Sequence, residues 1–239
     1  LAAYKAMEEL LGQKDMPKPS FVAGHSLGEY TALAITGSLD ISNTAKLVQE
    51  RGRLMQEACN LKPGTMAAII GLEEIIIEEI SRQTGTYISN VNTDQQVVIS
   101  GDIVAVAQAL DMASARGAKK AMPLKVSGAF HSALMEPARD GLESAVNAVN
   151  LKAPDTPIVA NITAKPIDTV HQLKNELVSQ ICECVQWKRS VEYMISLGIT
   201  NFIEIGPGKA LHGMLKRIDK SVDSMSIGNL SSIQGLTLK

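Results

Sequence analysis

The chain has 239 residues, of which 45% are hydrophobic, so it is long enough to bury a substantial core in one or two domains. With 23 basic and 25 acidic residues its net charge is −2, which excludes a global field that would attract nucleic acid or a membrane surface. No apolar run approaches the roughly twenty residues needed to cross a bilayer, and no signal peptide is recognisable.

Three cysteines are too few and too unevenly placed for a disulfide framework in a chain of this length. Cys182 and Cys184 also lack a second Cys or His pair at metal-binding spacing, so we interpret them as packing thiols and expect no metal site. Cysteine usage therefore predicts a reducing compartment, the cytoplasm.

Hydrophobic spacing predicts helices that alternate with short strands. Helices are expected over residues 1–11, 29–36, 43–59, 73–82, 103–116, 136–150, 169–182, 187–197 and 209–220. Strands are expected over residues 21–23, 66–70, 86–92, 96–100, 120–126, 158–162 and 201–205. Ser42 or Asn43 is expected to cap the third helix, and the serine-rich tail beyond Ser221 is expected to be loosely held.

The order of elements predicts an α/β fold with an insertion. Residues 66–126 read βαββαβ, the ferredoxin-like arrangement. We therefore predict a ferredoxin-like small subdomain over residues 61–126, inserted into an α/β large subdomain made of residues 1–60 and 127–239. The two helices of the insertion should cover one face of its sheet and leave the other face free to wall a cleft.

Residues 24–28, Gly-His-Ser-Leu-Gly, stand between an expected strand and an expected helix. This is the context of a nucleophile elbow, so Ser26 is the candidate nucleophile. Gly24 and Gly28 fit the turn because a Cβ at either position would collide as the strand reverses into the helix. The positive end of that helix faces the point where an oxyanion would develop. The alternative is a tight turn that merely contains a serine.

A serine nucleophile needs a base within hydrogen-bond reach, and the chain has four histidines. His131 lies in a loop just after the inferred insertion and is the candidate base. We assign His25 to packing or to lining the site, and His171 to a solvated helix. His212, beside a Gly-Pro-Gly turn, is the rival base because α/β-hydrolases order their triad as Ser, acid and His.

Five motifs in a fixed order carry a resemblance to a known family. They are Gly-His-Ser-Leu-Gly-Glu-Tyr at 24–30, Arg-Gly at 51–52 with Met-Gln at 55–56, Gly-Ala-Phe-His-Ser at 128–132 with Met-Glu-Pro at 135–137, Val-Gln-Trp at 185–187, and Glu-Ile-Gly-Pro-Gly-Lys at 204–209. From Leu1 to about Asp219 the chain resembles the malonyl-CoA:acyl carrier protein transacylases of bacterial fatty acid synthesis. The resemblance implies an α/β-hydrolase-like large subdomain with a ferredoxin-like insertion, in agreement with the division from periodicity.

The resemblance also implies roles for individual residues. Ser26 would be the acylated nucleophile and His131 its base, oriented by the main-chain carbonyl of Gln180. Arg51 would form a bidentate salt bridge with the malonyl carboxylate. Without the resemblance, Arg51 would be interpreted as a solvated helix residue. The bulky Phe130 before the histidine would leave little room for an α-methyl branch, so methylmalonyl should be disfavoured.

The implied activity is ping-pong transfer of a malonyl group from malonyl-CoA to the phosphopantetheine thiol of acyl carrier protein. No bound cofactor is expected, and we place His25, Phe130 and Arg51 in the substrate site. Because the carrier is acidic, the pairs at 188–189 and 216–217 are candidate docking points, with ordinary solvated faces as the alternative. Beyond the carrier and the CoA thioester we expect no nucleic acid or membrane partner, and a monomer.

One family motif is missing. The family begins with a strand and a Gly-Gln-Gly segment that supplies half of the oxyanion hole, so we expect that this chain lacks an N-terminal segment. The Leu27 N–H would then be its oxyanion donor. Three other readings stay open: a polyketide-type malonyl acyltransferase, an esterase that uses Ser26, Asp168 and His212, and an inactive truncated domain that only binds partners.

Overall fold

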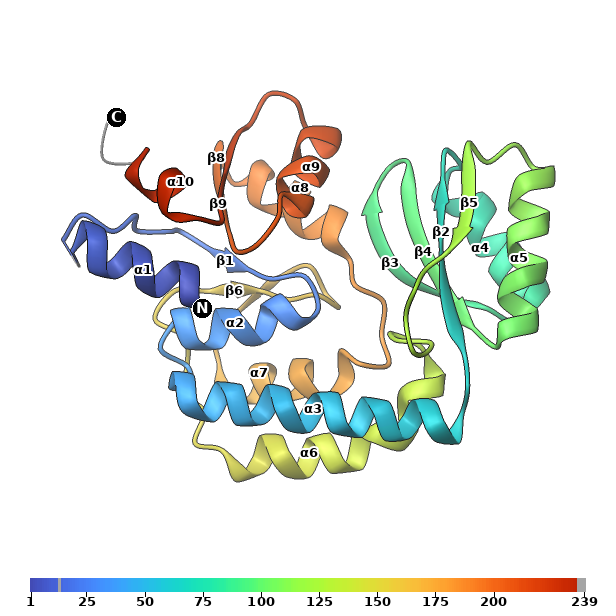
Figure 1. The fold of residues 1–239 in the computed structure, drawn as a ribbon, viewed down its shortest axis with the longest axis horizontal. Coiled ribbons are helices and arrows are strands. Elements are labelled where there is room, and N and C mark those ends of the chain that lie inside the picture. Colours follow the sequence, from blue (N-terminus) through green and yellow to red (C-terminus); the bar gives the residue numbers. More distant parts are fainter. Residues whose placement is uncertain (13, 236–239) are drawn as a thin grey trace.

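The computed structural model describes residues 1–12 and 14–235. Its ribbon divides into two lobes that face each other (Figure 1). The small lobe comprises residues 65–123, and the large lobe comprises the other described residues. The long helix α3 (Ile41–Leu61) leads from the large lobe into the small one, and the segment after residue 123 leads back.

The small lobe is a four-stranded antiparallel sheet with the order β3-β4-β2-β5. Its strands are β2 (Thr65–Ile70), β3 (Tyr87–Thr93), β4 (Gln96–Gly101) and β5 (Lys120–Pro123), and its helices are α4 (Glu74–Thr84) and α5 (Ile103–Ala115). This is the βαββαβ order and strand arrangement of a ferredoxin-like unit, and it confirms the predicted fold class. The exact boundaries, residues 60–61 and 126–127, stay a prediction.

Strand β2 shows how the small sheet divides its two faces. Ala67 and Ile69 are buried in a core shared with α4 and α5. Met66 and Ala68 alternate with them and pack on the opposite face with Phe130, which follows β5 in the chain. The period of two along the strand therefore sends one set of side chains to the helices and the other toward the large lobe.

Helices make most of the large lobe. They are α1 (Ala2–Leu11), α2 (Leu27–Ile35), α3, the 3₁₀ helix η1 (Ala133–Ala138), α6 (Arg139–Ala148), α7 (Val170–Ser179), α8 (Trp187–Ser196), α9 (Ala210–Ile218) and α10 (Leu230–Gln234). Helices α2, α3, α6 and α7 share one core, whose fully buried side chains include Tyr30, Leu33, Leu142, Leu173 and Leu177. This core fixes α2 and α3 against each other.

The strands of the large lobe are short. β1 (Val22–Ala23) runs parallel to β6 (Ile158–Val159), with Ala23 opposite Val159, and β7 (Pro166–Ile167) is antiparallel to β6. β8 (Asn201–Ile205) and β9 (Asp223–Ile227) form a separate parallel pair. Because β1 and β6 end side by side, the residues that follow them meet at the same edge.

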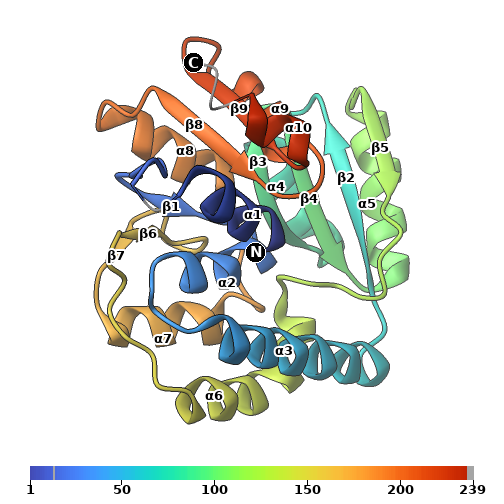
Figure 2. The same cartoon turned by 60° about the vertical axis from the view of Figure 1, so that its left-hand side comes forward.

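The expectation of a loosely held tail beyond Ser221 is wrong for the described residues. β9 pairs with β8 along its whole length, and Ile227 at its end and Ile233 of α10 pack in one cluster with Met7 of α1 (Figure 2). Met225 and Ile227 alternate with serines, which is a strand pattern that the serine content of the tail obscured. Residues 236–239 of that tail lie outside the described residues.

Three local expectations are also corrected. The helix expected over residues 136–150 starts as the 3₁₀ turn η1, which contains Pro137, and becomes α-helical only at Arg139. Asp40 caps α3 by accepting a hydrogen bond from the Asn43 N–H, so neither Ser42 nor Asn43 is the cap. The strand expected over residues 158–162 ends at Val159, and β7 was not predicted.

Candidate active site

Ser26 lies in a strained turn between β1 and α2. Its φ of 51° and ψ of −106° place it in a region that non-glycine residues rarely adopt. Gly24 makes the turn possible, because a Cβ there would lie 2.0 Å from the carbonyl carbon of Gly28. The same expectation for Gly28 is wrong, since a Cβ on Gly28 would meet no described atom within 4 Å. The close approach of the Gly28 backbone therefore requires a glycine at position 24 but not at position 28.

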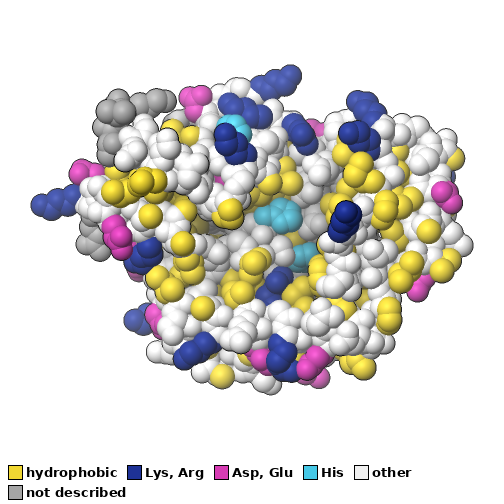
Figure 3. Space-filling view, in the orientation of Figure 1, with side chains coloured by type: hydrophobic (Ala, Val, Ile, Leu, Met, Phe, Trp, Pro, Cys, Tyr) yellow, Lys and Arg dark blue, Asp and Glu magenta, His cyan; other side chains and the backbone are white. Residues whose placement is uncertain are grey.

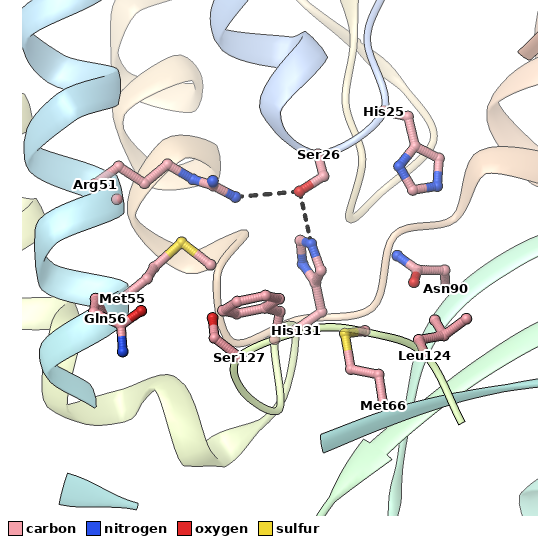
Figure 4. Close-up of a pocket in the computed structure, with 12 residues that line it drawn as sticks. His25, Ser26, Arg51, Met55, Gln56, Met66, Asn90, Leu124, Ser127 and His131 are labelled. Carbon is pink, nitrogen blue, oxygen red and sulfur yellow. Dashed lines mark hydrogen bonds between the residues drawn. The ribbon is translucent and has the colours of Figure 1, made fainter. Parts of the chain in front are cut away.

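The structure brings His131 to Ser26. His131 Nε2 lies 2.8 Å from Ser26 Oγ (Figure 4). Its Nδ1 lies 2.7 Å from the carbonyl oxygen of Gln180 and 3.2 Å from that of Glu183. Two carbonyl acceptors require a proton on Nδ1, so Nε2 carries the lone pair that accepts the serine hydroxyl. The main-chain contact with Gln180 is the one that the resemblance implied.

His131 is held as a neutral imidazole. Burial, with a further contribution from the positive charge of Arg51, lowers its pKa to about 3. The main-chain N–H of His131 donates to the carbonyl of Ile181 at 3.0 Å, and the φ of 57° at His131 turns the side chain back toward the serine. A neutral, oriented imidazole at hydrogen-bond distance from a hydroxyl is the arrangement that a general base needs.

Arg51 reaches the same serine from α3. It is only 7% exposed, and its Nη2 donates to Ser26 Oγ at 3.2 Å and to Gln180 Oε1 at 3.3 Å. The guanidinium carbon lies 5.2 Å from the centre of the Tyr30 ring. Its Nε is buried without a hydrogen-bond partner, and no carboxylate among the described residues pairs with it. A buried cation with a free donor is built to receive an anion.

These residues line a cavity of about 410 Å³ between the lobes. Figure 3 shows histidine side chains at the floor of the hollow that separates the lobes. The large lobe contributes His25, Ser26, Arg51, Gly52, Met55, Gln56 and His131, the small lobe contributes Met66 and Asn90, and the segment between them contributes Leu124, Ser127 and Phe130. The face of the small sheet that its helices leave free therefore helps to wall the cavity.

His25 faces this cavity as well. Its Nε2 lies 2.9 Å from Asn92 Oδ1 of β3, and its ring packs at 5.7 Å from that of Trp187. Burial lowers the pKa of His25, so its ring is uncharged and donates to Asn92. His25 therefore joins the two lobes at the edge of the site, in keeping with its assignment to the lining.

The N-terminus of α2 offers a hydrogen-bond donor next to the serine. The N–H groups of Gly28 and Glu29 donate to the carbonyls of His25 and Ser26, whereas the Leu27 N–H has no acceptor among residues 1–12 and 14–235. A free N–H in the first turn of a helix, directly after the nucleophile, is the usual source of an oxyanion donor.

Sequence reasoning missed a buried polar layer beneath Ser26. Asn161, just after β6, accepts the Ser26 N–H on its Oδ1 at 2.7 Å and donates through Nδ2 to Gly24 O at 2.7 Å. Glu29 of α2 and Glu176 of α7 are buried carboxyls in the same region. No signal in the sequence pointed to Asn161, because only the pairing of β1 with β6 brings the residues that follow these strands to one edge.

The esterase alternative is not assembled. His212 Nδ1 lies 2.9 Å from Ser224 Oγ of β9, and the His212 N–H donates to Glu204. Asp168 contacts Gln172 at the start of α7. Neither His212 nor Asp168 lines the cavity, so the structure does not bring them to Ser26.

The candidate docking cations are already engaged. Lys188 forms ion pairs with Asp94 and Glu192, and Arg189 pairs with Glu74 at 2.9 Å. Lys216 Nζ contacts the carbonyl of Val222, and Arg217 contacts the Gln96 side chain. Their role in docking stays a prediction.

The remaining sequence features add no second site. Cys59, Cys182 and Cys184 are free thiols, and the described part of the chain holds no group of three or more His, Cys, Asp or Glu placed to bind a metal ion. Within that same part, none of the helices is both long enough and apolar enough to cross a membrane.

Comparison with known proteins agrees with this geometry. The acyl transferase domain family model matches residues 2–232. The malonyl CoA-acyl carrier protein transacylase of Escherichia coli strain K12 is 39% identical over 237 residues, which cover 98% of this chain and 77% of the relative. The acyl-carrier-protein-S-malonyltransferase of Bartonella henselae superposes with a TM-score of 0.93 at 39% identity, covering 98% of this chain and 76% of the other. A malonyl-transacylase solved in complex with a type II PKS acyl-carrier protein superposes with a TM-score of 0.93 at 36% identity, covering 98% and 77%.

Proposed function

Because the chain belongs to the acyl transferase domain family, we propose that it transfers the malonyl group of malonyl-CoA to the phosphopantetheine thiol of an acyl carrier protein in fatty acid synthesis. One observation carries the proposal. Ser26 Oγ contacts both the imidazole of His131 and the guanidinium of Arg51, so a nucleophile, its base and a carboxylate-binding cation meet at one atom. The first two support acyl transfer, and the third supports selection of a carboxylated acyl group.

The first half-reaction acylates Ser26. His131 Nε2 takes the hydroxyl proton as Ser26 Oγ attacks the thioester carbonyl of malonyl-CoA. The resulting imidazolium is stabilised by the carbonyls of Gln180 and Glu183, which accept its Nδ1–H. The C–S bond then breaks, and His131 returns the proton to the leaving CoA thiolate. Malonyl-Ser26 and free CoA are the products.

The second half-reaction reverses these roles. The pantetheine thiol of the carrier gives its proton to His131, and its sulfur attacks the malonyl-Ser26 ester. Collapse of that intermediate releases the Ser26 oxygen, which recovers the proton from His131. Both tetrahedral intermediates carry an oxyanion, and the Leu27 N–H is the donor that we assign to it. The reaction needs no bound cofactor.

Arg51 and Phe130 are the residues that we assign to donor selection. The partnerless Nε of Arg51, together with its Nη2, supports a bidentate contact with the malonyl carboxylate. A neutral acetyl group would leave this buried guanidinium without an anion, so acetyl-CoA should be a poor donor. Phe130 packs with Met66 along the wall of the cavity, which supports exclusion of an α-methyl branch.

The partner of the second half-reaction is an acyl carrier protein. The names of relatives of this chain include acyl carrier protein, and one solved relative is in complex with a type II PKS acyl-carrier protein. Carriers of fatty acid and polyketide type are therefore both substrates to test. The cytoplasmic location, the monomeric state and the docking roles of Lys188, Arg189, Lys216 and Arg217 remain predictions.

The test is acylation of the purified chain. After incubation with malonyl-CoA and an acid quench, mass spectrometry should find one malonyl group on the peptide that contains Ser26, and added carrier protein should remove it. Ser26→Ala should abolish the adduct. A folded chain that takes no malonyl group, or takes it at another residue, would overturn the proposal.

A further inference from the structure

Three segments of the large lobe meet directly beneath the nucleophile. Glu29 lies in the first turn of α2, Asn161 follows β6, and Gln180 follows α7. Glu29 and Gln180 are 0% exposed and Asn161 is 2% exposed. Polar side chains so far from water are costly unless their hydrogen bonds are satisfied, so the contacts among them decide how the layer is arranged.

Asn161 clamps both sides of the strained turn. Its Oδ1 accepts the Ser26 N–H at 2.7 Å, and its Nδ2 donates to Gly24 O at 2.7 Å and to Glu29 Oε1 at 2.9 Å. Its main-chain N–H also donates to Glu29 Oε1 at 2.9 Å. Only an amide offers an acceptor to one side of Ser26 and a donor to the other, so an aspartate or an apolar residue could not make the same pair of contacts.

Gln180 contacts the nucleophile, the base and the cation of the proposed mechanism. Its Nε2 donates to Ser26 O at 3.1 Å and to Glu29 Oε2. Its Oε1 accepts from Arg51 Nη2, and its main-chain carbonyl accepts from His131 Nδ1. A change in the position of this one residue would therefore move the base and the carboxylate-binding cation together.

Glu29 decides which way both amides point. An amide can turn its oxygen and its NH₂ group either way with little cost of shape, but a carboxylate only accepts hydrogen bonds. Glu29 Oε1 and Oε2 therefore draw the NH₂ groups of Asn161 and Gln180 toward themselves. The opposite ends follow: Asn161 Oδ1 faces the Ser26 N–H, and Gln180 Oε1 faces Arg51.

Burial, together with the charge of Glu176, raises the pKa of Glu29, whereas the N–H groups of Asn161 and Gln180 oppose that rise. All three N–H contacts require an acceptor, and a protonated Glu29 would have to turn its O–H toward one of these donors. The geometry, with three N–H donors placed on two carboxyl oxygens, is what orients the two amides.

We infer that Glu29 and Asn161 are positioning residues, which act through the orientation of two buried amides to align Ser26, His131 and Arg51. The inference rests on the proposed function, because it assigns the alignment to that reaction. Neither Glu29 nor Asn161 lines the cavity, so neither touches the substrate.

The test compares two buried carboxyls. Glu29→Gln keeps the shape but puts an NH₂ group where an acceptor is needed, so Gln180 must lose its contact or turn its own NH₂ group toward Arg51. Glu176→Gln is the matched control. Glu176 is also buried, but its Oε1 accepts a hydrogen bond from the main-chain N–H of Ile162 at 2.9 Å, and an amide oxygen can accept this bond equally well.

Two reactions of Ser26 are measured on each variant, with melting temperature as the check on folding. The first is acylation by malonyl-CoA, with kcat and KM determined separately and acetyl-CoA as the competing donor. The second is labelling of Ser26 by phenylmethylsulfonyl fluoride, which needs the serine and its base but no carboxylate. We expect Glu29→Gln to lose about 10²-fold in malonyl kcat/KM, to label more slowly and to discriminate less against acetyl-CoA. Glu176→Gln should stay within about threefold of the unaltered chain in both reactions.

Folding defects alone would lower the active fraction but would leave KM and the malonyl-to-acetyl ratio unchanged, so these two readouts isolate positioning. Equal rates and equal ratios for Glu29→Gln and Glu176→Gln would overturn the inference. If Glu29→Gln does not fold, Asn161→Asp takes its place. This variant keeps an acceptor for the Ser26 N–H and loses the donor to Gly24 O. Unchanged rates in Asn161→Asp would also overturn the inference.

The proposed function fails separately. If the unaltered chain takes no malonyl group but still reacts with phenylmethylsulfonyl fluoride, the proposed donor is wrong. The labelling rates of Glu29→Gln and Glu176→Gln then still test whether Glu29 aligns the serine with its base.

Discussion

Replacement of Arg51 by alanine is the sharpest test of how the site chooses its donor. In the free protein the guanidinium makes two contacts through Nη2, at 3.2 and 3.3 Å, and its Nε makes none with the described residues. A substrate carboxylate would complete a buried ion pair. Removing one partner of such a pair typically costs about 3–5 kcal/mol, and each 1.36 kcal/mol changes a rate about tenfold.

We therefore expect Arg51→Ala to lower kcat/KM for malonyl-CoA by about 10²- to 10³-fold. The rate with acetyl-CoA should fall much less, because acetyl has no carboxylate to lose. The kcat/KM of Arg51→Lys for malonyl-CoA should lie between those of Arg51→Ala and the unaltered chain, because an ammonium cannot form the bidentate contact. Rates of Ser26 acylation, measured by rapid acid quench and mass spectrometry with each donor, give the malonyl-to-acetyl ratio.

Arg53 supplies the matched control on the same helix. It is exposed, and it pairs with Glu50 and Glu57 instead of facing the cavity. Arg53→Ala should leave the donor ratio unchanged, and it should alter stability little because its ion pairs lie in solvent. A malonyl-to-acetyl ratio that is the same in Arg51→Ala and in the unaltered chain would refute the assignment of Arg51 to the carboxylate.

Three further predictions concern the turn, the base and the buried acid. Gly24→Ala should lower the free energy of unfolding by about 3 kcal/mol or more, because the new Cβ would lie 2.0 Å from backbone. Gly213→Ala, in open space on α9, should raise the free energy of unfolding by up to about 1 kcal/mol. Urea unfolding measures both, and similar effects of the two substitutions would contradict the close approach at Gly24. Because burial lowers the pKa of His131 to about 3, the base stays neutral through mild acid. The fall of kcat/KM on the acid side should therefore lie well below pH 6.5. A fall at or above pH 6.5 would contradict a base that burial keeps neutral. Burial raises the pKa of Glu176 from 4.5 to about 7, so the folded chain holds this proton more tightly than the unfolded chain, and stability should fall by about 3 kcal/mol as pH rises from 4.5 to 7. Unfolding of Glu176→Gln should show a smaller fall, because Glu29, whose pKa burial also raises, still contributes to it; an identical pH profile would show that Glu176 is not one of its sources.

The sequence predicted most of the fold because local patterns determine most of it. The small lobe follows from strands with a period of two and helices with a period near 3.6, and its sheet order agrees with the ferredoxin-like expectation. The elbow at Ser26 follows from its motif, which stands between an expected strand and an expected helix, and from the close approach at Gly24. The end of the chain was mispredicted because the serines of β9 suggest a linker, although Met225 and Ile227 give it one apolar face.

The site was predictable only in part, for a physical reason. No local pattern brings His131 to a serine 105 positions away, so its loop position made it only a candidate base, and the family resemblance implied the same role. Glu29 looks like an ordinary acidic residue in the first turn of a helix, where it would be solvated. The burial of Glu29, and the hydrogen bonds of Asn161 with Ser26 and Gly24, arise only when α7 and the segment after β6 close over α2. Such tertiary contacts leave no signal in a single sequence.

The walls of the cavity come from two lobes, and only one of them carries the reacting groups. Ser26, His131 and Arg51 are all fixed to one buried framework in the large lobe, whereas Met66 and Asn90 come from the sheet of the other lobe. Replacing side chains on that sheet reshapes the space around the acyl chain without touching the proton path. An enzyme assembled in this way can acquire a new acyl preference through its insertion while its nucleophile, base and anion-binding arginine stay where they are.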